Sequence, residues 1–430
     1  MPDEQAQVRI EAAPLARGVA GWWARSWVRE LWPFLGPAFL VSVGYMDPGN
    51  WGTDIEGGAR FGYQLLWVIL LSNIMAIFLQ SLSAKLGIVS GRTLAENCRV
   101  HYPRPLSIFL WITAEFAAMA TDLAEFLGAA LGFYLLFGIP LFPAAILAGI
   151  VVFLTLSLYR YGYRLVEYVI LGYVAVIGLA YVLEVYLSSP QWGEIAYHLV
   201  TPKVNSESIL VAVGILGATV MPHNLYLHSG LVQTRLVNGT KVQNSKHILF
   251  AVADSIIGLN MAFFINAAIL IMSAAVFYRH GIAVASIEEA HQTLRPLLGE
   301  LSALAFAVAL LCSGLSSSTT GTLAGQMIIE GFLNIRIPLW VRRAVTMIPA
   351  LIVIGLGWDP LKILVLSQVS LSLQLPFAVI PLIHFTGSRK VLGEHTNRPL
   401  TTALAVLVAL LILGLNGLLL FRILGGRFSF

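Results

Sequence analysis

The sequence predicts an all-α integral membrane protein of about eleven transmembrane helices, arranged as five plus five in an inverted repeat with one further helix. Hydrophobic residues make up 58% of the 430 positions and charged residues only 11%, whereas soluble domains average about 25% charged residues. Many windows exceed the roughly 20 apolar residues that span a bilayer as a helix, and the alternating pattern of a membrane β-barrel is absent. An x-Pro-x-Asn pattern at 47–50 and again at 221–224 relates two of these windows.

Hydropathy predicts the order of the membrane spans and locates their ends to within several residues. Residues 1–30 combine arginines with tryptophans and lack an apolar core ahead of a cleavage site, so we expect a cytoplasmic tail or interfacial helix and no signal peptide. Residues 31–430 form a single membrane domain, because no connection is long enough for a soluble one. The predicted spans are 31–58, 64–88, 106–136, 140–158, 165–187, 207–232, 248–277, 298–331, 338–357, 359–385 and 399–423.

The basic residues predict the orientation. With the N-terminus in the cytoplasm, 19 of the 26 Lys and Arg residues fall inside and 7 outside, as the positive-inside rule requires. With eleven spans, the C-terminus then lies on the outer side of the cell membrane. The net charge of +4 is thus explained by topology, and a nucleic-acid partner is not expected. Cys98 and Cys312 are far apart and indicate neither a disulfide nor a thiolate metal site.

Two predicted helix breaks point to a central binding site. Pro48 with Gly49, and Pro222, interrupt the first and sixth spans, and the backbone groups that a mid-helix proline frees need partners inside a bilayer. Five spans separate the breaks, and an odd repeat length inverts the second copy, so repeat one covers 31–187, repeat two 207–385, and 399–423 is extra. The alternative is that these are two ordinary proline kinks, which have a Pro and an Asn at the same spacing by chance.

The residues around the breaks offer ligands for a divalent transition metal. Asp47 supplies a carboxylate, Asn50 and Asn224 supply neutral oxygens, and unwound backbone near Gly44 and Ala218 supplies carbonyls. Met221 discriminates between metals, because a thioether suits Mn²⁺, Fe²⁺, Co²⁺ or Cd²⁺ better than Ca²⁺ or Mg²⁺. Ordinary packing is the alternative interpretation of a lone methionine.

A second polar set predicts a proton pathway. At about 100° per residue, Glu115, Asp122 and Glu125 share one face of the third span. Acid and histidine chains mark proton relays in transporters, and the sixth span carries two histidines. Basic residues at the start of the ninth span are candidates to pair with the acids, although structural ion pairs and plain cytoplasmic anchors remain alternatives. The histidines and arginines are His223, His228, Arg342 and Arg343.

Less specific polar residues lie in later spans. Ser313–Thr322 is rich in Ser, Thr and Gly, which is more typical of close helix packing than of a pathway. Gln368 in the tenth span is placed to reach a central ion, and interhelical hydrogen bonding is its alternative role.

The paired motifs Asp47-Pro48-Gly49-Asn50 and Met221-Pro222-His223-Asn224 resemble the natural-resistance-associated macrophage protein (Nramp) family, in its bacterial branch. Four further stretches support the resemblance over the membrane region: residues 57–60 (GGAR), 120–126 (ATDLAEF), 314–318 (GLSSS) and 374–377 (QLPF). The resemblance implies a leucine-transporter-like fold and proton-coupled import of divalent metal ions by alternating access.

Carried over by position, the resemblance implies that the metal ligands are Asp47, Asn50, Met221 and the Ala218 carbonyl, joined by Gln368 in some states. It also implies a proton path from Asp47 through Asp122 and Glu125 with Arg342 or Arg343, tuned by His223 and His228. The sixth-span methionine, at which magnesium-transporting relatives differ, is kept here.

The sequence therefore predicts a transporter of divalent metal ions, foremost Mn²⁺ and also Fe²⁺, Co²⁺ and Cd²⁺. We expect it to need no cofactor and to interact with metal ions, protons and lipid. The sequence does not determine the oligomeric state, and we expect a monomer. One alternative is a cation-coupled amino-acid symporter of the same fold, but Asp47 would repel a substrate carboxylate. The other is a membrane metalloenzyme, which the five-residue spacing of His223 and His228 disfavours.

Overall fold

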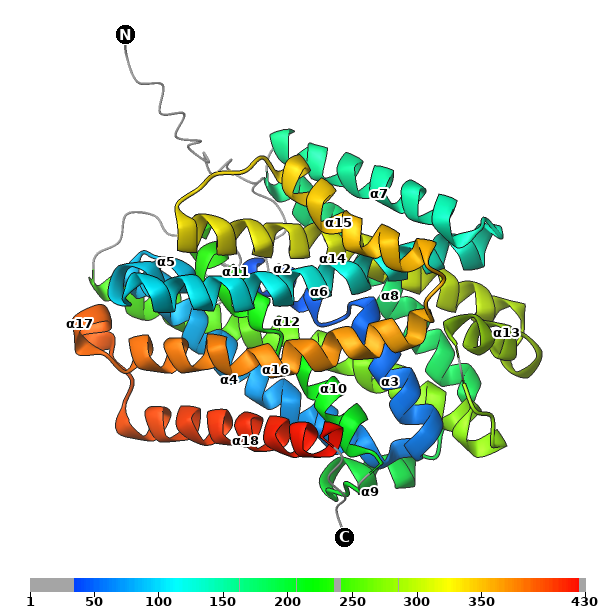
Figure 1. Cartoon of the computed structure of the whole chain (residues 1–430). Coiled ribbons are helices and arrows are strands. Elements are labelled where there is room, and N and C mark those ends of the chain that lie inside the picture. The colour runs from blue at the N-terminus through cyan, green and yellow to red at the C-terminus, as the bar shows by residue number, and fades with distance from the viewer. Residues whose placement is uncertain (1–34, 162, 206, 236–240, 285, 425–430) are drawn as a thin grey trace, which may run out of the picture. The chain divides into compact units, whose positions relative to one another are not determined.

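A computed structural model describes residues 35–161, 163–205, 207–235, 241–284 and 286–424, which lie in one compact unit. Every regular element within these ranges is a helix, and they contain no strand (Figure 1). Eight helical segments of the described chain are long and apolar enough to cross a bilayer, in addition to the shorter apolar helix Leu141–Ser157. The predicted tail at 1–30 lies outside the described residues.

The first repeat follows the predicted spans closely, and its first span consists of two helices, as the predicted break requires. The helices are α2 (Pro37–Gly44), α3 (Pro48–Phe61), α4 (Leu66–Ser90), α5 (Leu94–His101), α6 (Arg104–Phe137), α7 (Leu141–Ser157) and α8 (Tyr163–Ser188).

The second repeat has the same plan, and its first span is also divided in two. Its helices, with those of its connections and the extra span, are α9 (Trp192–Val200), α10 (Ile209–Thr219), α11 (Pro222–Leu231), α12 (Lys241–Val276), α13 (Ile287–Leu298), α14 (Glu300–Leu333), α15 (Leu339–Gly355), α16 (Pro360–Thr386), α17 (Arg389–Leu392) and α18 (Pro399–Ile423). The all-helical fold with broken first and sixth spans is therefore confirmed.

Short-range signals in the sequence account for several helix ends. The C-cap residues of α4 and α6 are Gly91 and Gly138, which take the left-handed φ values of 63° and 66° that glycine tolerates best. Thr93 and Glu96 form a reciprocal capping box at the start of α5, the helix that follows α4. These caps fix the reversals of the chain at the membrane surface.

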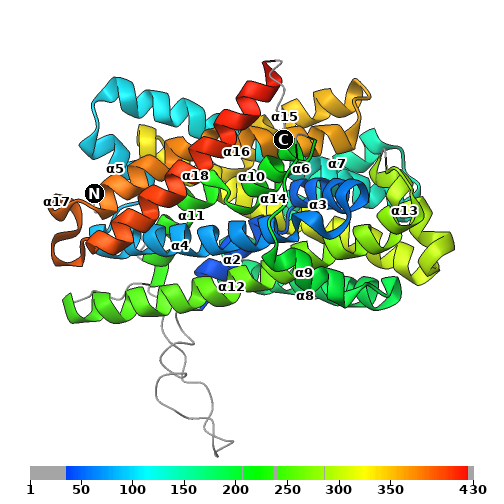
Figure 2. The ribbon, with the colours of Figure 1, turned by 90° about the horizontal axis from the view of Figure 1, so that it is seen from below.

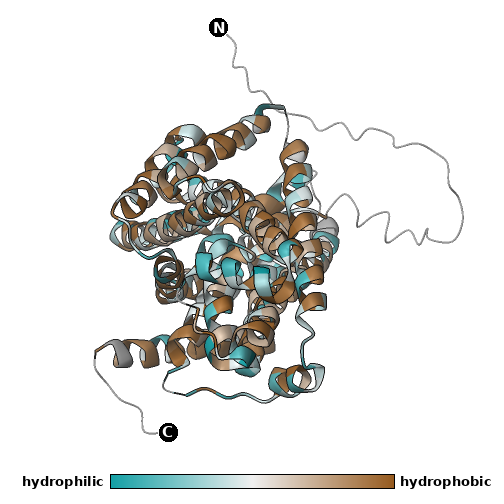
Figure 3. Cartoon of the chain, turned by 90° about the vertical axis from the view of Figure 1, so that its right-hand side faces the viewer, coloured by the Kyte–Doolittle hydropathy of each residue, from teal (hydrophilic) through white to brown (hydrophobic). Residues whose placement is uncertain are grey.

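The broken helices occupy the centre of the bundle. In the segment that contains α10 and α11, 94% of the most apolar window is buried, against 22% in α18. α18 lies against α16 at one side, while α7 and α15 lie side by side elsewhere (Figures 1 and 2). Brown, apolar residues dominate most of the helices, with teal residues between them (Figure 3). A polar site in the broken helices is therefore enclosed by apolar ones.

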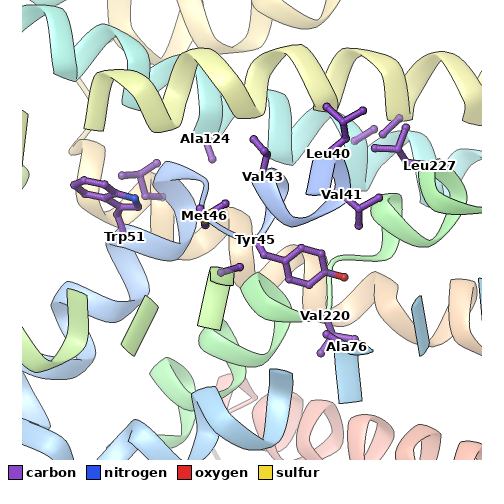
Figure 4. Close-up of a cluster of buried hydrophobic side chains, with 14 of the residues drawn as sticks. Leu40, Val41, Val43, Tyr45, Met46, Trp51, Ala76, Ala124, Val220 and Leu227 are labelled. Carbon is purple, nitrogen blue, oxygen red and sulfur yellow. The ribbon is translucent and has the colours of Figure 1, made fainter. Parts of the chain in front are cut away.

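Figure 4 shows the apolar surroundings of the first break. Tyr45 and Met46 lie on the link between α2 and α3, and both are buried with Trp51 of α3 and Val220 at the end of α10. Large buried side chains thus surround the first break.

Candidate functional site

The first break begins a helix at membrane depth. Asp47 is the N-cap of α3, where its Oδ1 accepts a hydrogen bond of 2.9 Å from the backbone N–H of Asn50. Pro48 occupies the first helical position, at which a missing N–H costs nothing. The x-Pro-x-Asn pattern is therefore a helix start, and it leaves Oδ2 of Asp47 for other partners.

The second break repeats this design. α10 ends at Thr219, and Met221 is the N-cap residue ahead of Pro222. The Asn224 amide donates to the Val41 carbonyl at 3.4 Å and to the Met221 sulfur at 3.5 Å. Asn224 therefore ties the second break to α2 through its amide nitrogen.

Gln368 of α16 contacts both breaks. Its Nε2 donates to Asp47 Oδ2 at 3.4 Å. A Cβ added to Gly49 would lie 1.5 Å from that nitrogen, and one added to Gly217 would lie 2.2 Å from the Gln368 carbonyl oxygen. The absence of a Cβ at Gly217 allows the backbones of α10 and α16 to approach this closely, and its absence at Gly49 leaves room for the Gln368 amide. The structure therefore brings Gln368 to the predicted site, and its Oε1 has no hydrogen-bond partner among the described residues.

Two side chains that the sequence analysis missed hold the unwound backbone. Asn266 of α12 donates to the Tyr45 carbonyl at 2.8 Å, and Ser313 of α14 donates to the Met46 carbonyl at 2.5 Å. These bonds satisfy acceptors that the break removes from the helix. An asparagine in an apolar stretch (residues 261–272) was the available signal for Asn266, whereas Ser313 lay in a stretch interpreted as packing.

The candidate ligands are all buried and carry little charge. The described residues contain no group of three or more His, Cys, Asp and Glu side chains that could hold a metal. A cation here would thus depend on one carboxylate with neutral oxygen and sulfur donors, and a low ligand charge favours reversible binding. The predicted ligands Asp47, Asn50, Ala218, Met221 and Gln368 have relative exposures of 0–1%.

The acids of α6 pair with successive arginines of α15. Arg343 donates to Asp122 at 3.1 Å and to Ser318 at 3.0 Å, and Arg342 donates to Glu115 at 2.8 Å. Both oxygens of Glu125 lack a hydrogen-bond partner among the described residues. The geometry selects Arg343 for the deep acid and leaves Glu125 unpaired.

The two histidines of α11 have separate partners. His223 Nδ1 lies 3.2 Å from the Thr121 hydroxyl, next to Asp122 in sequence. His228 Nδ1 lies 3.0 Å from Gln80 Oε1, and the Gln80 amide donates to the Tyr45 hydroxyl at 2.7 Å. His223 therefore adjoins the acid helix, while His228 connects α11 to α4 and the first break.

A polar cluster secures the start of α2. The Asp254 carboxylate of α12 accepts hydrogen bonds from the backbone N–H groups of Gly36 (3.2 Å) and Ala38 (2.8 Å). Arg235 pairs with Glu167 at 2.5 Å, and a Cβ on Gly36 would lie 2.8 Å from the Arg235 guanidinium. Asp254 thus caps α2, the shorter half of the first broken span.

Comparison with known proteins places this geometry in a family. Residues 38–422 match the profile described as natural resistance-associated macrophage protein-like. A divalent metal cation transporter MntH of Caldanaerobacter subterraneus subsp. tengcongensis is 54% identical over 401 residues, covering 93% of this chain and 95% of that protein.

Solved structures agree with this match. A manganese transporter of Eremococcus coleocola, crystallised with an aromatic bis-isothiourea compound, superimposes with a TM-score of 0.82 at 36% identity, covering 93% of this chain and 88% of that one. Mhp1, a nucleobase-cation-symport-1 family transporter in a closed conformation, matches with a TM-score of 0.61 at 15% identity, over 89% and 88% of the two chains. The Mhp1 match concerns the fold alone.

Proposed function

The chain belongs to the natural resistance-associated macrophage protein (Nramp) family, and from this premise we propose that it imports Mn²⁺ foremost, and Fe²⁺, Co²⁺ and Cd²⁺, together with protons. It is a multi-pass membrane transporter of divalent metal ions and not an enzyme. The metal is its cargo rather than a resident cofactor.

The ligand set at the two breaks carries the proposal on selectivity. Asp47, the Ala218 carbonyl and the amide oxygens of Asn50 and Gln368 would bind any divalent cation, whereas the Met221 sulfur favours softer ions. Both half-helices α2 and α10 end at the site, and the partial negative charge at a helix C-terminus favours a cation.

Release would follow movement of the half-helices. In alternating access, the site opens to one side of the membrane at a time while the flanking helices stay in place. α2 is only 8 residues long, and its start is held by Asp254. Separation of this cap would open the site toward the cytoplasm.

Protons would leave the metal site through α6 and α15. Glu125 lies within electrostatic range of both Asp47 and Asp122, and Asp122 is paired with Arg343. A proton displaced from Asp47 would pass by Glu125 to Asp122, with His223 positioned beside this route by Thr121. The His228 network would couple the route to the first break.

The orientation follows the positive-inside count, with the N-terminus in the cytoplasm and the C-terminus outside. The proposed working unit is a monomer, because each inverted-repeat pair encloses a complete site.

Proteoliposome uptake tests the proposal. Vesicles are loaded with a metal-sensitive dye and a pH indicator, and Mn²⁺ or Ca²⁺ is added outside under an imposed pH gradient. We expect Mn²⁺ uptake that rises with external acidity, internal acidification, and no Ca²⁺ signal. Asp47→Asn should abolish uptake, while Glu56→Gln on the same helix, which loses only an exposed pair with Arg60, should not. Mn²⁺ uptake without proton movement would contradict the coupling.

A further inference from the structure

The last helix has no role in the mechanism above, although it carries a buried polar side chain. α18 lies outside the inverted repeat, and only 22% of its most apolar window is buried. Asn416 is the one polar side chain in residues 403–421, and it is 5% exposed. A polar group at membrane depth is costly unless it is hydrogen-bonded. Asn416 therefore needs a specific partner.

Both ends of the Asn416 amide bond to Ser372 of α16. The amide nitrogen donates to the Ser372 backbone carbonyl at 2.7 Å, and Oδ1 accepts from the Ser372 hydroxyl at 2.9 Å. The sequence neighbours Leu373 and Leu415 pack against one apolar cluster of α10, α16 and α18. The pair is thus a specific polar contact inside an apolar interface.

The Ser372 carbonyl needs this donor because of a proline. In an α-helix, the carbonyl of residue i accepts from the N–H of residue i+4, and the residue four positions after Ser372 is Pro376, inside α16. Proline has no N–H. A carbonyl freed in this way inside a bilayer is satisfied by a neighbouring helix, and Asn416 supplies the donor. The QLPF stretch at 374–377 therefore opens the backbone of α16 at the point that α18 covers.

The adjoining turn of α16 carries Gln368, which contacts both helix breaks. Gln368 precedes Ser372 by four residues, which is about 6 Å along the helix. A Cβ added to Gly217 would lie 2.2 Å from the Gln368 carbonyl oxygen and 2.7 Å from the Ser372 nitrogen, so α10 packs directly against this turn. Ala218, whose carbonyl is a proposed metal ligand, follows Gly217 in the chain. The turn is therefore held by α18 at one end and lies against the metal site at the other.

We propose that Asn416 is a positioning residue for the metal site, because it holds the backbone of α16 at Pro376 and thereby sets the place of Gln368 beside Asp47. α18 then contributes to metal binding without touching the ion. The inference rests on the proposed role of Gln368 as a metal ligand. If Asn416 served only to attach α18 to the bundle, its loss would not act through Gln368.

Metal binding tests the positioning role. Asn416→Leu keeps the size of the side chain and removes both hydrogen bonds. The Mn²⁺ affinity of the purified protein, measured calorimetrically, should fall on the order of tenfold, as for the loss of one positioned hydrogen bond in the interior. In the Gln368→Ala background the same substitution should change the affinity by less than about twofold, because the effect passes through Gln368. Equal losses in the two backgrounds, or wild-type affinity in either single variant, would overturn the positioning role.

Serine variants of α16 provide the controls. The Ser370 hydroxyl binds the Leu366 carbonyl of its own helix at 2.9 Å, so Ser370→Ala should leave the Mn²⁺ affinity unchanged. Ser372→Ala removes the hydroxyl but keeps the bond from Asn416 to the carbonyl, and it should cost less affinity than Asn416→Leu. A loss as large as that of Asn416→Leu would contradict the importance of the carbonyl bond.

Removal of the proline separates failure of this inference from failure of the proposed metal site. Pro376→Ala restores the N–H that the Ser372 carbonyl lacks, so Asn416→Leu should destabilise the protein less in this background than in the wild-type one. Free energies of unfolding in detergent micelles, measured without metal, give the comparison. Equal destabilisation in both backgrounds would refute the role of Asn416 at the freed carbonyl. If the proline variant compensates but the wild-type protein binds no Mn²⁺, the proposed metal site is wrong and the bond to the freed carbonyl stands.

Discussion

Removing the charge of Asp122 should destabilise the protein far more than removing the charge of an exposed acid. Asp122 and Arg343 form an ion pair of 3.1 Å whose side chains are 1% and 0% exposed. The guanidinium also donates to Ser318 and lies 5.5 Å from the ring of Phe126. Asp122→Asn would leave this buried guanidinium without the carboxylate to which it is hydrogen-bonded.

The magnitude follows from burial. Breaking a buried ion pair by neutralising one partner costs about 3–5 kcal/mol, because an uncompensated charge stays in the interior. An exposed pair contributes about 0.2–1 kcal/mol. Glu56 and Arg60 provide the comparison, with a shorter contact of 2.7 Å but side-chain exposures of 19% and 48%. We therefore expect a difference of about 3 kcal/mol between Asp122→Asn and Glu56→Gln.

The assay is reversible unfolding in mixed detergent micelles, with the free energy of unfolding measured for each variant. The double variant Asp122→Asn/Arg343→Gln should recover part of the loss, because the orphaned charge is gone. Equal effects of Asp122→Asn and Glu56→Gln would refute the reasoning, as would a double variant whose loss is the sum of the two single losses.

Three further predictions concern the breaks and the half-helices. Met221→Ala should lower discrimination against Ca²⁺ while Mn²⁺ uptake persists, as measured by competition in vesicles; unchanged Ca²⁺ rejection would contradict the thioether argument. Asp254→Ala, which removes the acceptor of both backbone hydrogen bonds, should weaken the cap of α2 by about 1 kcal/mol, roughly a fivefold shift toward a cytoplasm-open state. Faster thiol labelling of a cysteine introduced at Val41 from the inside would report this shift, and unchanged labelling would speak against it. Gly128→Ala should cost about 1–3 kcal/mol by overpacking, because its Cβ would lie 2.1 Å from the Pro48 ring. Gly178→Ala, whose Cβ meets nothing within 4 Å, is the control, and equal unfolding free energies would refute the clash.

Local patterns in the sequence were sufficient to predict the membrane spans and the two helix breaks. Hydropathy locates a membrane helix because the bilayer imposes one length and one solvent on it. The two x-Pro-x-Asn motifs predicted interrupted helices because a proline excludes an N–H at a defined position, and the structure begins α3 and α11 at Pro48 and Pro222.

The pairing of polar side chains was decided only by tertiary structure. The sequence placed Glu115, Asp122 and Glu125 on one face, yet could not assign Arg342 to Glu115 and Arg343 to Asp122. Such pairing depends on the rotation and depth of α15 against α6, which packing among many distant residues determines.

The same limit applies to the side chains that support the site. Asn266 and Ser313 lie more than 200 residues from the carbonyls that they bind, and the ring of Trp51 contacts that of Tyr181 on another helix, which local sequence cannot specify. The sequence by itself thus determined which helices form, where two of them break and which donor atoms the breaks carry, since these depend on neighbouring residues. The folded bundle decided which partner each buried polar atom has, because that depends on contacts between segments far apart in the chain.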